Sequence, residues 1–185
     1  LSAEAEERLR ATWVDLRDRA AALDGLDEAD AVTRDLLLHE LDDAIRAIDL
    51  RLAEMAWDQL DGVHADLLIT AGQLRAPEPE HARMAIERTR RYGTMLDQAA
   101  DRFRAALAAG RTPARINIER SLNQVEGYLD SPIERDPFVN LAGPEGWDGL
   151  DAWRDELATA VREHVRPAFA RYRDVLRDEL APAAR

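Results

Sequence analysis

The feature that most constrains this chain is the helical spacing of its apolar residues. In the stretch 27–57 the apolar residues follow one another in steps of three and four, as Leu38, Leu41, Ile45, Ile48, Leu52 and Met55. Residues at that spacing share one face of an α-helix, which turns once every ~3.6 residues. Leu37 and Ala44 widen this face beyond a coiled-coil seam. We therefore predict a helix of about eight turns, ~45 Å long, packed inside a globular bundle.

The same spacing predicts five further helices, over 3–23, 64–74, 80–109, 113–130 and 148–180. Gly25 and Gly110 lie where helices would end, because glycine tolerates a left-handed C-terminal residue. Pro79 and Pro113 lie where helices would begin, because proline suits the first helical turn. Ala and Leu supply much of the 46% hydrophobic content, and both favour helices. With no alternating strand pattern, we predict an all-α fold, a bundle of about five to six helices, several of them long.

One long irregular segment and one proline interrupt this pattern. The segment 131–146, SPIERDPFVNLAGPEG, holds three prolines and two glycines, and loops of this length are usually functional or mobile. Pro167 removes a backbone donor inside the last helix and should kink it near Glu163 and His164. We expect the His164 imidazole to bond a carbonyl that this kink frees. We also expect one domain over 1–185, with a helical hairpin at 1–57, central helices at 63–130 and a long kinked helix at 148–180.

Charge and composition exclude several classes of function. The net charge is −12, from 25 arginines and 37 acidic residues, so we expect no nucleic-acid partner. Without cysteine, the chain has no disulfides, thiol nucleophiles or cysteine-based zinc sites. No apolar run approaches the ~20 residues of a membrane span and no signal core opens the chain, so we expect a cytoplasmic protein without a membrane partner. The start without Met, LSAEAEERLR, and the end, LAPAAR, lead us to expect the N-terminal fragment of a larger protein.

The histidines do not form a recognisable metal site. A helical zinc site needs two ligands four residues apart, as in H-E-x-x-H. His39 begins such a motif, but Asp43 stands where the second histidine would lie. We interpret His39 and Asp43 as a surface pair, with a mixed ligand pair as the alternative. His64 and His81 adjoin loops, and we expect both to be solvated or hydrogen-bonded locally.

The acidic residues do not form a recognisable catalytic site either. Neighbouring pairs arise by chance among 37 acids, and nothing marks one member as buried, as a raised pKa would require. The pairs considered are Asp42/Asp43, Glu54/Asp58 and Asp174/Asp178. We therefore predict no catalytic residue and no metal ligand within 1–185, and we assign no substrate-binding residue.

Two polar residues allow two interpretations, and the tryptophans allow one. Asn123 and Gln124 adjoin the apolar stripe of the helix over 113–130. We favour a hydrogen bond to a neighbouring helix, with a position in a cleft as the alternative. The tryptophans are spread along the chain, and we predict that they serve as core or edge packing; they are Trp13, Trp57, Trp147 and Trp153.

Three stretches in a fixed order carry a resemblance to a known family. They are LDGVHADLLITAGQL, MAIERTRRYGTMLDQAADRFRAALAAGRTPARINIERSLNQVEGYLDSP and VREHVRPAFARYRDVLRDELAPAAR. Their order and spacing resemble the N-terminal half of the bacterial domain-of-unknown-function family 885, over residues 58–185 and more weakly over 27–57. The shared features include a leucine-rich segment after an aspartate turn, an arginine-rich helix, and a P-A-F-x-x-Y helix. Members of this family are larger helical proteins related to zincin metallopeptidases.

The resemblance implies a parent enzyme that depends on zinc and hydrolyses peptide or amide bonds. In such enzymes a metal-bound water attacks the carbonyl, and the Glu of H-E-x-x-H acts as general base. That motif is absent from these 185 residues, so no catalytic role transfers to a residue here. The zinc would lie in the C-terminal catalytic half of the same protein, which is the implied partner, and the substrate would be a peptide. This chain would form a wall or lid of the substrate cleft.

Two other functions remain open on the sequence alone. A stand-alone helical interaction or scaffold protein, without enzymatic activity, would explain the wide apolar stripes at 38–55 and 150–180. A helical binding domain for a small ligand would use the 131–146 segment as its lid. The first predicts a monodisperse chain that unfolds cooperatively, and the second predicts that a ligand protects this segment from proteases.

Overall fold

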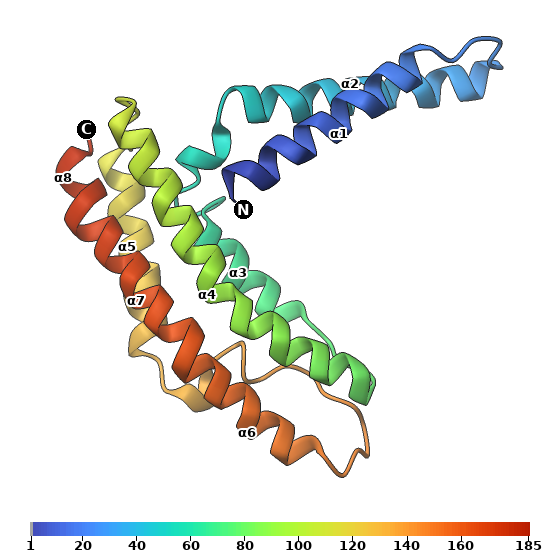
Figure 1. The fold of residues 1–185 in the computed structure, drawn as a ribbon. Helices are drawn as coiled ribbons and strands as arrows, with labels where there is room; N and C mark the ends of the chain where they lie inside the picture. The colour runs from blue at the N-terminus through green and yellow to red at the C-terminus, as the bar shows by residue number, and fades with distance from the viewer. Residues whose placement is uncertain (1) are drawn as a thin grey trace. The chain divides into compact units, whose positions relative to one another are not determined.

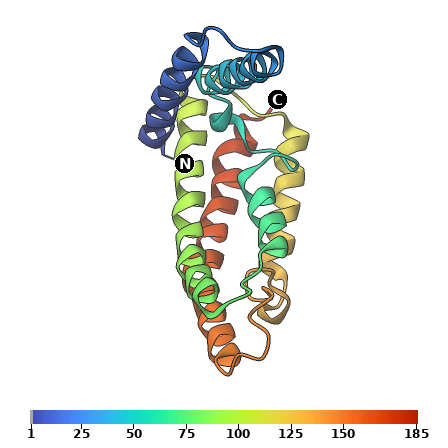
Figure 2. The same ribbon diagram turned by 90° about the vertical axis from the view of Figure 1, so that its right-hand side faces the viewer.

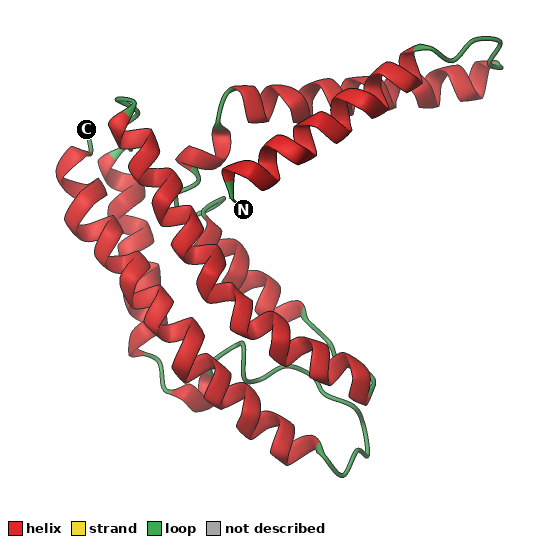
Figure 3. Ribbon diagram, viewed as in Figure 1, coloured by secondary structure: helices red, strands yellow, loops and turns green. Residues whose placement is uncertain are grey.

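The computed structural model describes residues 2–185, and every regular element among them is helical (Figures 1 and 3). The separate helices are α1 (Ala3–Ala21), α2 (Glu28–Asp49), α3 (Val63–Gln73), α4 (Pro79–Ala108) and α5 (Arg115–Asp130). A continuous helical run over 150–183 contains α6 (Leu150–Ala160), α7 (Arg166–Val175) and α8 (Ala181–Ala183). With this run counted as one helix, the described residues form six, and the predicted all-α fold is confirmed. None of the described helices has both the length and the apolar character needed to cross a membrane.

The chain divides into two compact units, one ending at Glu54 and one spanning Met55–Arg185. The single domain expected from the sequence has a hairpin over 1–57 as its first part, and the boundary between the units lies close to the end of that hairpin. The first unit is built on α1 and α2, and the second contains all the later helices.

α1 and α2 form a helical hairpin whose turn is specified locally. Gly25 has a φ of +69°, a left-handed conformation that glycine adopts at low cost. The Asp27 carboxylate caps α2 by accepting a hydrogen bond of 2.9 Å from the Asp30 N–H. Arg10 of α1 donates two hydrogen bonds, of 2.8 and 3.3 Å, to Asp49 of α2. The open end of the hairpin is therefore tied together by a pair 39 residues apart in sequence.

The prediction that the second helix runs to Trp57 is wrong, because α2 ends at Asp49. Arg51 has a φ of +56°, and its N–H bonds back to the Ile48 carbonyl at 2.8 Å. A left-handed residue in this position is a common way to end a helix. A short 3₁₀ turn, Leu52–Met55, follows. Its apolar residues keep the helical spacing, so periodicity alone did not reveal the break.

In the second unit α4 and the 150–183 run pack side by side, with α3 and α5 against them (Figures 1 and 2). Aromatic rings fill the space between these helices. The Phe103 ring of α4 lies 5.8 Å from Tyr172 of α7 and 5.6 Å from Trp57, between centroids. Tyr128 of α5 lies 4.4 Å from Phe169 of α7. These tilted and edge contacts are favourable geometries for aromatic pairs, so the core joins α4, α5 and α7.

Two prolines in the final run are accommodated by π-helical turns. The turn Val161–Val165 precedes Pro167, and the turn Leu176–Leu180 precedes Pro182. A proline ring clashes with the carbonyl four residues before it, and the wider π turn moves that carbonyl away. A π turn therefore lies at Glu163 and His164, where the sequence predicts a kink.

Gly93 sets how closely α4 approaches this first π turn. A Cβ atom built on Gly93 would lie 2.8 Å from the His164 carbonyl oxygen and 3.5 Å from the Ala168 Cβ. Real Cβ atoms essentially never come within 3.0 Å of another heavy atom. The absence of a side chain at this position thus allows backbone to pack against backbone at the centre of the unit.

The prediction that the helix over 113–130 starts at Pro113 is wrong by two residues, because α5 starts at Arg115. The C-terminal residue pairs with this segment instead. The Arg115 N–H donates to the Arg185 carbonyl at 2.9 Å, and the Arg185 N–H donates to the Pro113 carbonyl at 3.1 Å. This extended pairing uses the Pro113 carbonyl, which a helix starting there would need as an acceptor, and the sequence gives no local sign of it.

Candidate functional site

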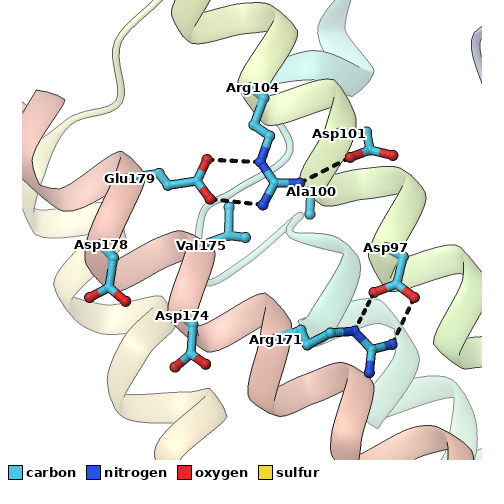
Figure 4. A pocket seen from close by; sticks show the side chains of 9 residues that line it. All are labelled: Asp97, Ala100, Asp101, Arg104, Arg171, Asp174, Val175, Asp178 and Glu179. Atoms are coloured by element: carbon cyan, nitrogen blue, oxygen red, sulfur yellow. Dashed lines mark hydrogen bonds and ion pairs between the residues drawn. The ribbon is translucent and has the colours of Figure 1, made fainter.

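The candidate site is a charged groove between α4 and the helical run that contains α7 (Figure 4). Its volume is about 450 Å³, within the roughly 300–1,000 Å³ of typical ligand pockets. The lining side chains are Asp97, Ala100, Asp101, Arg104, Arg171, Asp174, Val175, Asp178 and Glu179. Carboxylates and two guanidinium groups thus surround a small apolar patch made of Ala100 and Val175.

Two arginines reach across the groove to carboxylates on its opposite wall. Arg171 donates to both carboxylate oxygens of Asp97, at 3.0 and 2.7 Å. Arg104 donates to both oxygens of Glu179, at 2.8 Å each, and to Asp101 at 3.0 Å. Two-pronged pairs of this kind fix the orientation of both partners. The groove therefore has a defined arrangement of charge, with the arginines largely neutralised by their own partners.

The carboxylates of the groove are exposed to solvent. The exposed fraction of the side chain runs from 38% for Glu179 to 76% for Asp101. The hydrogen bond from Arg104 lowers the pKa of Glu179, and the hydrogen bond from Arg177 lowers the pKa of Asp178. These two groups are ionised near neutral pH and suit binding of N–H groups or cations. They lack the raised pKa that a general acid requires.

One acidic pair that the sequence suggests is a chance neighbour lies in this groove. The Asp174/Asp178 pair lies in it, and Arg177 donates to both members, at 2.8 and 2.9 Å. The other lining residues escaped notice because Arg104 and Glu179 are 75 residues apart in sequence. Charged residues on long helices give no local signal of such a partner.

His64 contradicts the expectation that it is solvated or locally hydrogen-bonded. It is fully buried, with Nδ1 3.2 Å from the Tyr172 hydroxyl and Nε2 3.0 Å from the Gln124 side-chain oxygen. The Gln124 amide nitrogen donates to the Gln59 carbonyl at 3.2 Å, which turns its oxygen towards His64. We therefore assign the proton to Nε2, and the Tyr172 hydroxyl donates to Nδ1. Both partners are far away in sequence, so the loop beside His64 was a poor guide.

Burial keeps His64 neutral. Desolvation lowers the pKa of His64, against a smaller opposite effect of the Gln124 hydrogen bond. Gly62 makes room for the ring, because a Cβ there would lie 2.8 Å from the His64 Cε1. The cluster is a satisfied polar network inside the core, and its ring lies beside Tyr172 at 5.5 Å between centroids. Its geometry indicates a structural role for His64.

Gln124 connects this network to a smaller, mainly apolar groove of about 330 Å³ between α3 and α5. Its lining residues are Gln59, Ala65, Leu68, Ile69, Gln124 and Tyr128. The predicted hydrogen bond from Gln124 to a neighbouring element is confirmed, and the residue also lines a groove, as the alternative expected. Asn123 is exposed.

The 131–146 segment is anchored along its length. The buried Asp136 carboxylate accepts a hydrogen bond of 3.0 Å from Arg166 and another from the Phe138 N–H. Arg166 also donates to the Ser131 carbonyl at 2.7 Å. Further along, the Ala142 carbonyl accepts from the Ala76 N–H at 2.8 Å. A segment held at these points has the character of a strap around the core and not of a free lid.

Asp136 is the buried acid that the sequence analysis did not find. Its side chain accepts the N–H two residues ahead, in an Asx turn. The Asp136-Pro137 pair is a recognisable signal for such a turn. Its ion pair with Arg166, 30 residues later, gave no such signal, because it depends on how the segment crosses α7.

No group of three or more His, Asp or Glu within residues 2–185 is placed to hold a metal ion. His39 Nε2 lies 3.5 Å from Asp43 Oδ2, and both side chains are more than half exposed, so the interpretation as a surface pair is confirmed. His81 is exposed, as expected. The expected hydrogen bond from the His164 imidazole is wrong: the side chain is exposed, and the residue contributes its carbonyl to the contact with Gly93.

The tryptophans pack as predicted. Trp57 and Trp153 are buried in the core, and the Trp153 Nε1–H donates to the Ala82 carbonyl at 2.8 Å. Trp147 packs at the edge of the smaller apolar cluster around Trp153, and Trp13 is half-buried on α1. The hydrogen bond of Trp153 satisfies a polar group that burial would otherwise leave unpaired.

One family match covers the whole chain. The sequence model of the family described as "Bacterial protein of unknown function (DUF885)" matches residues 1–185. No curated protein and no solved structure matches the chain. The family match extends over both compact units.

Proposed function

This chain belongs to the bacterial DUF885 family, and on that premise we propose that it is the N-terminal helical region of a zinc-dependent, peptidase-like hydrolase. In this proposal it forms a wall or lid of the substrate cleft and is not catalytic by itself. Its partner is the C-terminal catalytic half of the same protein, and the substrate is a peptide. We place the protein in the cytoplasm.

The observation that carries the proposal is where the resembling stretches fall in the structure. The first contains α3, the second contains most of α4 together with α5, and the third contains α7 and α8. These helices provide the main core of the second unit. The resemblance to a zincin-related family therefore extends over the residues that pack together, which is the pattern expected when a whole structural unit is shared.

Zinc would not be held by this chain. The nearest approach to a helical ligand pair is His39 with Asp43, which is exposed and has no third ligand beside it among the described residues. The residues present therefore do not fit a catalytic zinc site, and we assign the chain no step of the hydrolysis. Its proposed contribution is to bind and position substrate.

The charged groove supplies the surface for that contribution. An extended peptide offers backbone N–H groups and basic side chains, and exposed carboxylates accept hydrogen bonds from both. Asp174 and Asp178 line the groove, and their arginine partners come from the same helical run. Asp97 and Glu179 are already engaged across the groove. The first two are therefore the residues through which we expect substrate binding.

The test is a kinetic comparison in the protein encoded by the full reading frame. We expect bound zinc, and hydrolysis of a basic model peptide that a chelator abolishes. Asp174→Asn combined with Asp178→Asn should raise KM about tenfold and leave kcat unchanged, as for lost uniform binding. The matched control is Asp151→Asn with Asp155→Asn, on the exposed face of α6. A stop codon directly after Arg185, or a downstream sequence without H-E-x-x-H, would contradict the proposal.

The alternative is a stand-alone helical interaction or scaffold protein without enzymatic activity. The observation that favours it is the apolar surface of the hairpin, where Leu23, Val32, Leu36 and Leu50 are exposed. It predicts that the purified 185-residue chain is monodisperse and unfolds cooperatively. Zinc-dependent peptidase activity of the protein encoded by the full reading frame would exclude it.

A further inference from the structure

The outer face of α2 carries a stripe of apolar and acidic residues. At 100° per residue, this face lies opposite the buried Leu41 and Ile45. It presents Leu36, Glu40, Asp43 and Ala47, which follow one another in steps of four, three and four. Leu36 is 59% exposed and Glu40 is exposed. We name these four residues the acidic stripe.

An equivalent stripe of opposite charge lies on α4. Met84, Arg88, Arg91 and Met95 follow one another with the same steps of four, three and four. They lie on the side of α4 away from its buried residues, such as Thr89 and Leu96. Met84 is 56% exposed and Met95 36% exposed, and both arginines are exposed. We name these four residues the basic stripe.

The two stripes match position by position. Each has an apolar residue at the first and last place and a charged residue at the two inner places, and the charges are opposite. In parallel or in antiparallel alignment, apolar meets apolar and acid meets arginine. Steps of four and three are those of a helix face that packs against another helix, and opposite charges on two such faces favour their pairing over that of like-charged faces.

We infer that the acidic stripe of one molecule docks on the basic stripe of a second copy of this chain. Each copy carries one stripe of each kind, so each stripe has a complementary stripe on a second copy. Charge selects this pairing. Two acidic stripes would repel each other, and so would two basic stripes. The contact is separate from the charged groove and does not depend on the proposed hydrolase function.

Charge reversal with recombination tests this contact. One variant carries Glu40→Arg and Asp43→Arg, and the other carries Arg88→Glu and Arg91→Glu. We expect wild type to be dimeric at high concentration by sedimentation equilibrium. Each variant alone should associate at least about tenfold more weakly than wild type, because it places like charges opposite each other. An equimolar mixture of the two variants should dimerise again, because both contacts then regain opposite charges.

Control variants keep the result interpretable. Asp151→Arg with Asp155→Arg, and Arg154→Glu with Arg162→Glu, reverse the same number of exposed charges away from both stripes and should leave the dimer unchanged. Circular dichroism checks that each variant is folded. A third variant, Leu36→Glu, attacks the apolar end of the stripe and should also weaken the dimer. A monomeric wild type at every concentration, or a mixture that stays monomeric while wild type is dimeric, would overturn the inference.

Discussion

Replacing Gly93 by alanine tests the close packing of α4 on the final helical run. The added methyl group would lie 2.8 Å from the His164 carbonyl oxygen, whereas ordinary contacts begin at 3.4 Å. Both groups belong to backbones inside the core, so no flexible side chain can move aside. The two helices must separate locally by roughly half an ångström to restore a normal contact distance, and that separation loosens the packing of Ala168 beside it.

The expected loss of stability is the difference between two effects. Overpacking in a well-packed core costs about 1–3 kcal/mol, and the upper part of that range applies because the clash is with backbone. Alanine gains back about 1 kcal/mol over glycine in a helix interior. Gly93→Ala should therefore lower the free energy of unfolding by about 1–2 kcal/mol.

Gly127→Ala is the matched control. Gly127 lies within α5, and a Cβ atom there would have no heavy atom within 4 Å. Only the helix propensity applies, so this variant should gain about 0.5–1 kcal/mol. Urea denaturation followed by circular dichroism measures both, with the midpoint compared at equal slope. If Gly93→Ala proves as stable as Gly127→Ala, the close backbone contact at the centre of the unit is refuted.

Three other changes probe the site and its surroundings. Burial lowers the pKa of His64 below the ~6.5 of the unfolded chain, so the unfolded state binds more protons below that pH. The free energy of unfolding should therefore fall as the pH drops from 7.5 to 5. A His64→Gln variant should lose that part of the pH dependence. Asp136→Asn should lower the free energy of unfolding by about 2–4 kcal/mol, measured by heat or urea, because it leaves the mostly buried Arg166 without its charge partner. A loss under about 0.5 kcal/mol would show that the pair does not hold the 131–146 segment. Arg171→Ala removes an exposed pair with Asp97 and should cost less than about 1 kcal/mol in the same assay, so a larger loss would mean that the groove pairs hold the helices together.

Helix positions were predictable wherever a local signal agreed with the packing. Pro79 begins α4, and Gly110 follows its end with a φ of +77°, as the sequence predicts. α1 and α3 also lie close to their predicted limits. In these places the residue that ends or begins the helix acts through its own backbone preferences, which no tertiary contact needs to supply.

One failure is local, because α2 ends at Asp49 before the left-handed Arg51 although the apolar spacing continues. The other failures occurred where a distant segment decided the local structure. α5 starts late, and the backbone of Arg185 pairs with Pro113 and Arg115 at its start. His64 and Asp136 are buried because α5 and α7 bring Gln124, Tyr172 and Arg166 to them. A spacing rule describes one helix and cannot report which other helix will cover it.

By itself, then, the sequence determined the helical fold class, most helix limits and the pattern of charge and apolar residues along each helix. These depend on interactions within a few residues, and so they can be read from spacing and from proline and glycine positions. Only the tertiary structure decided which charged residues meet across the groove, which histidine is buried and neutral, and which segment is strapped to the core. Those outcomes depend on contacts between residues 30 to 108 positions apart, and packing alone brings such residues together.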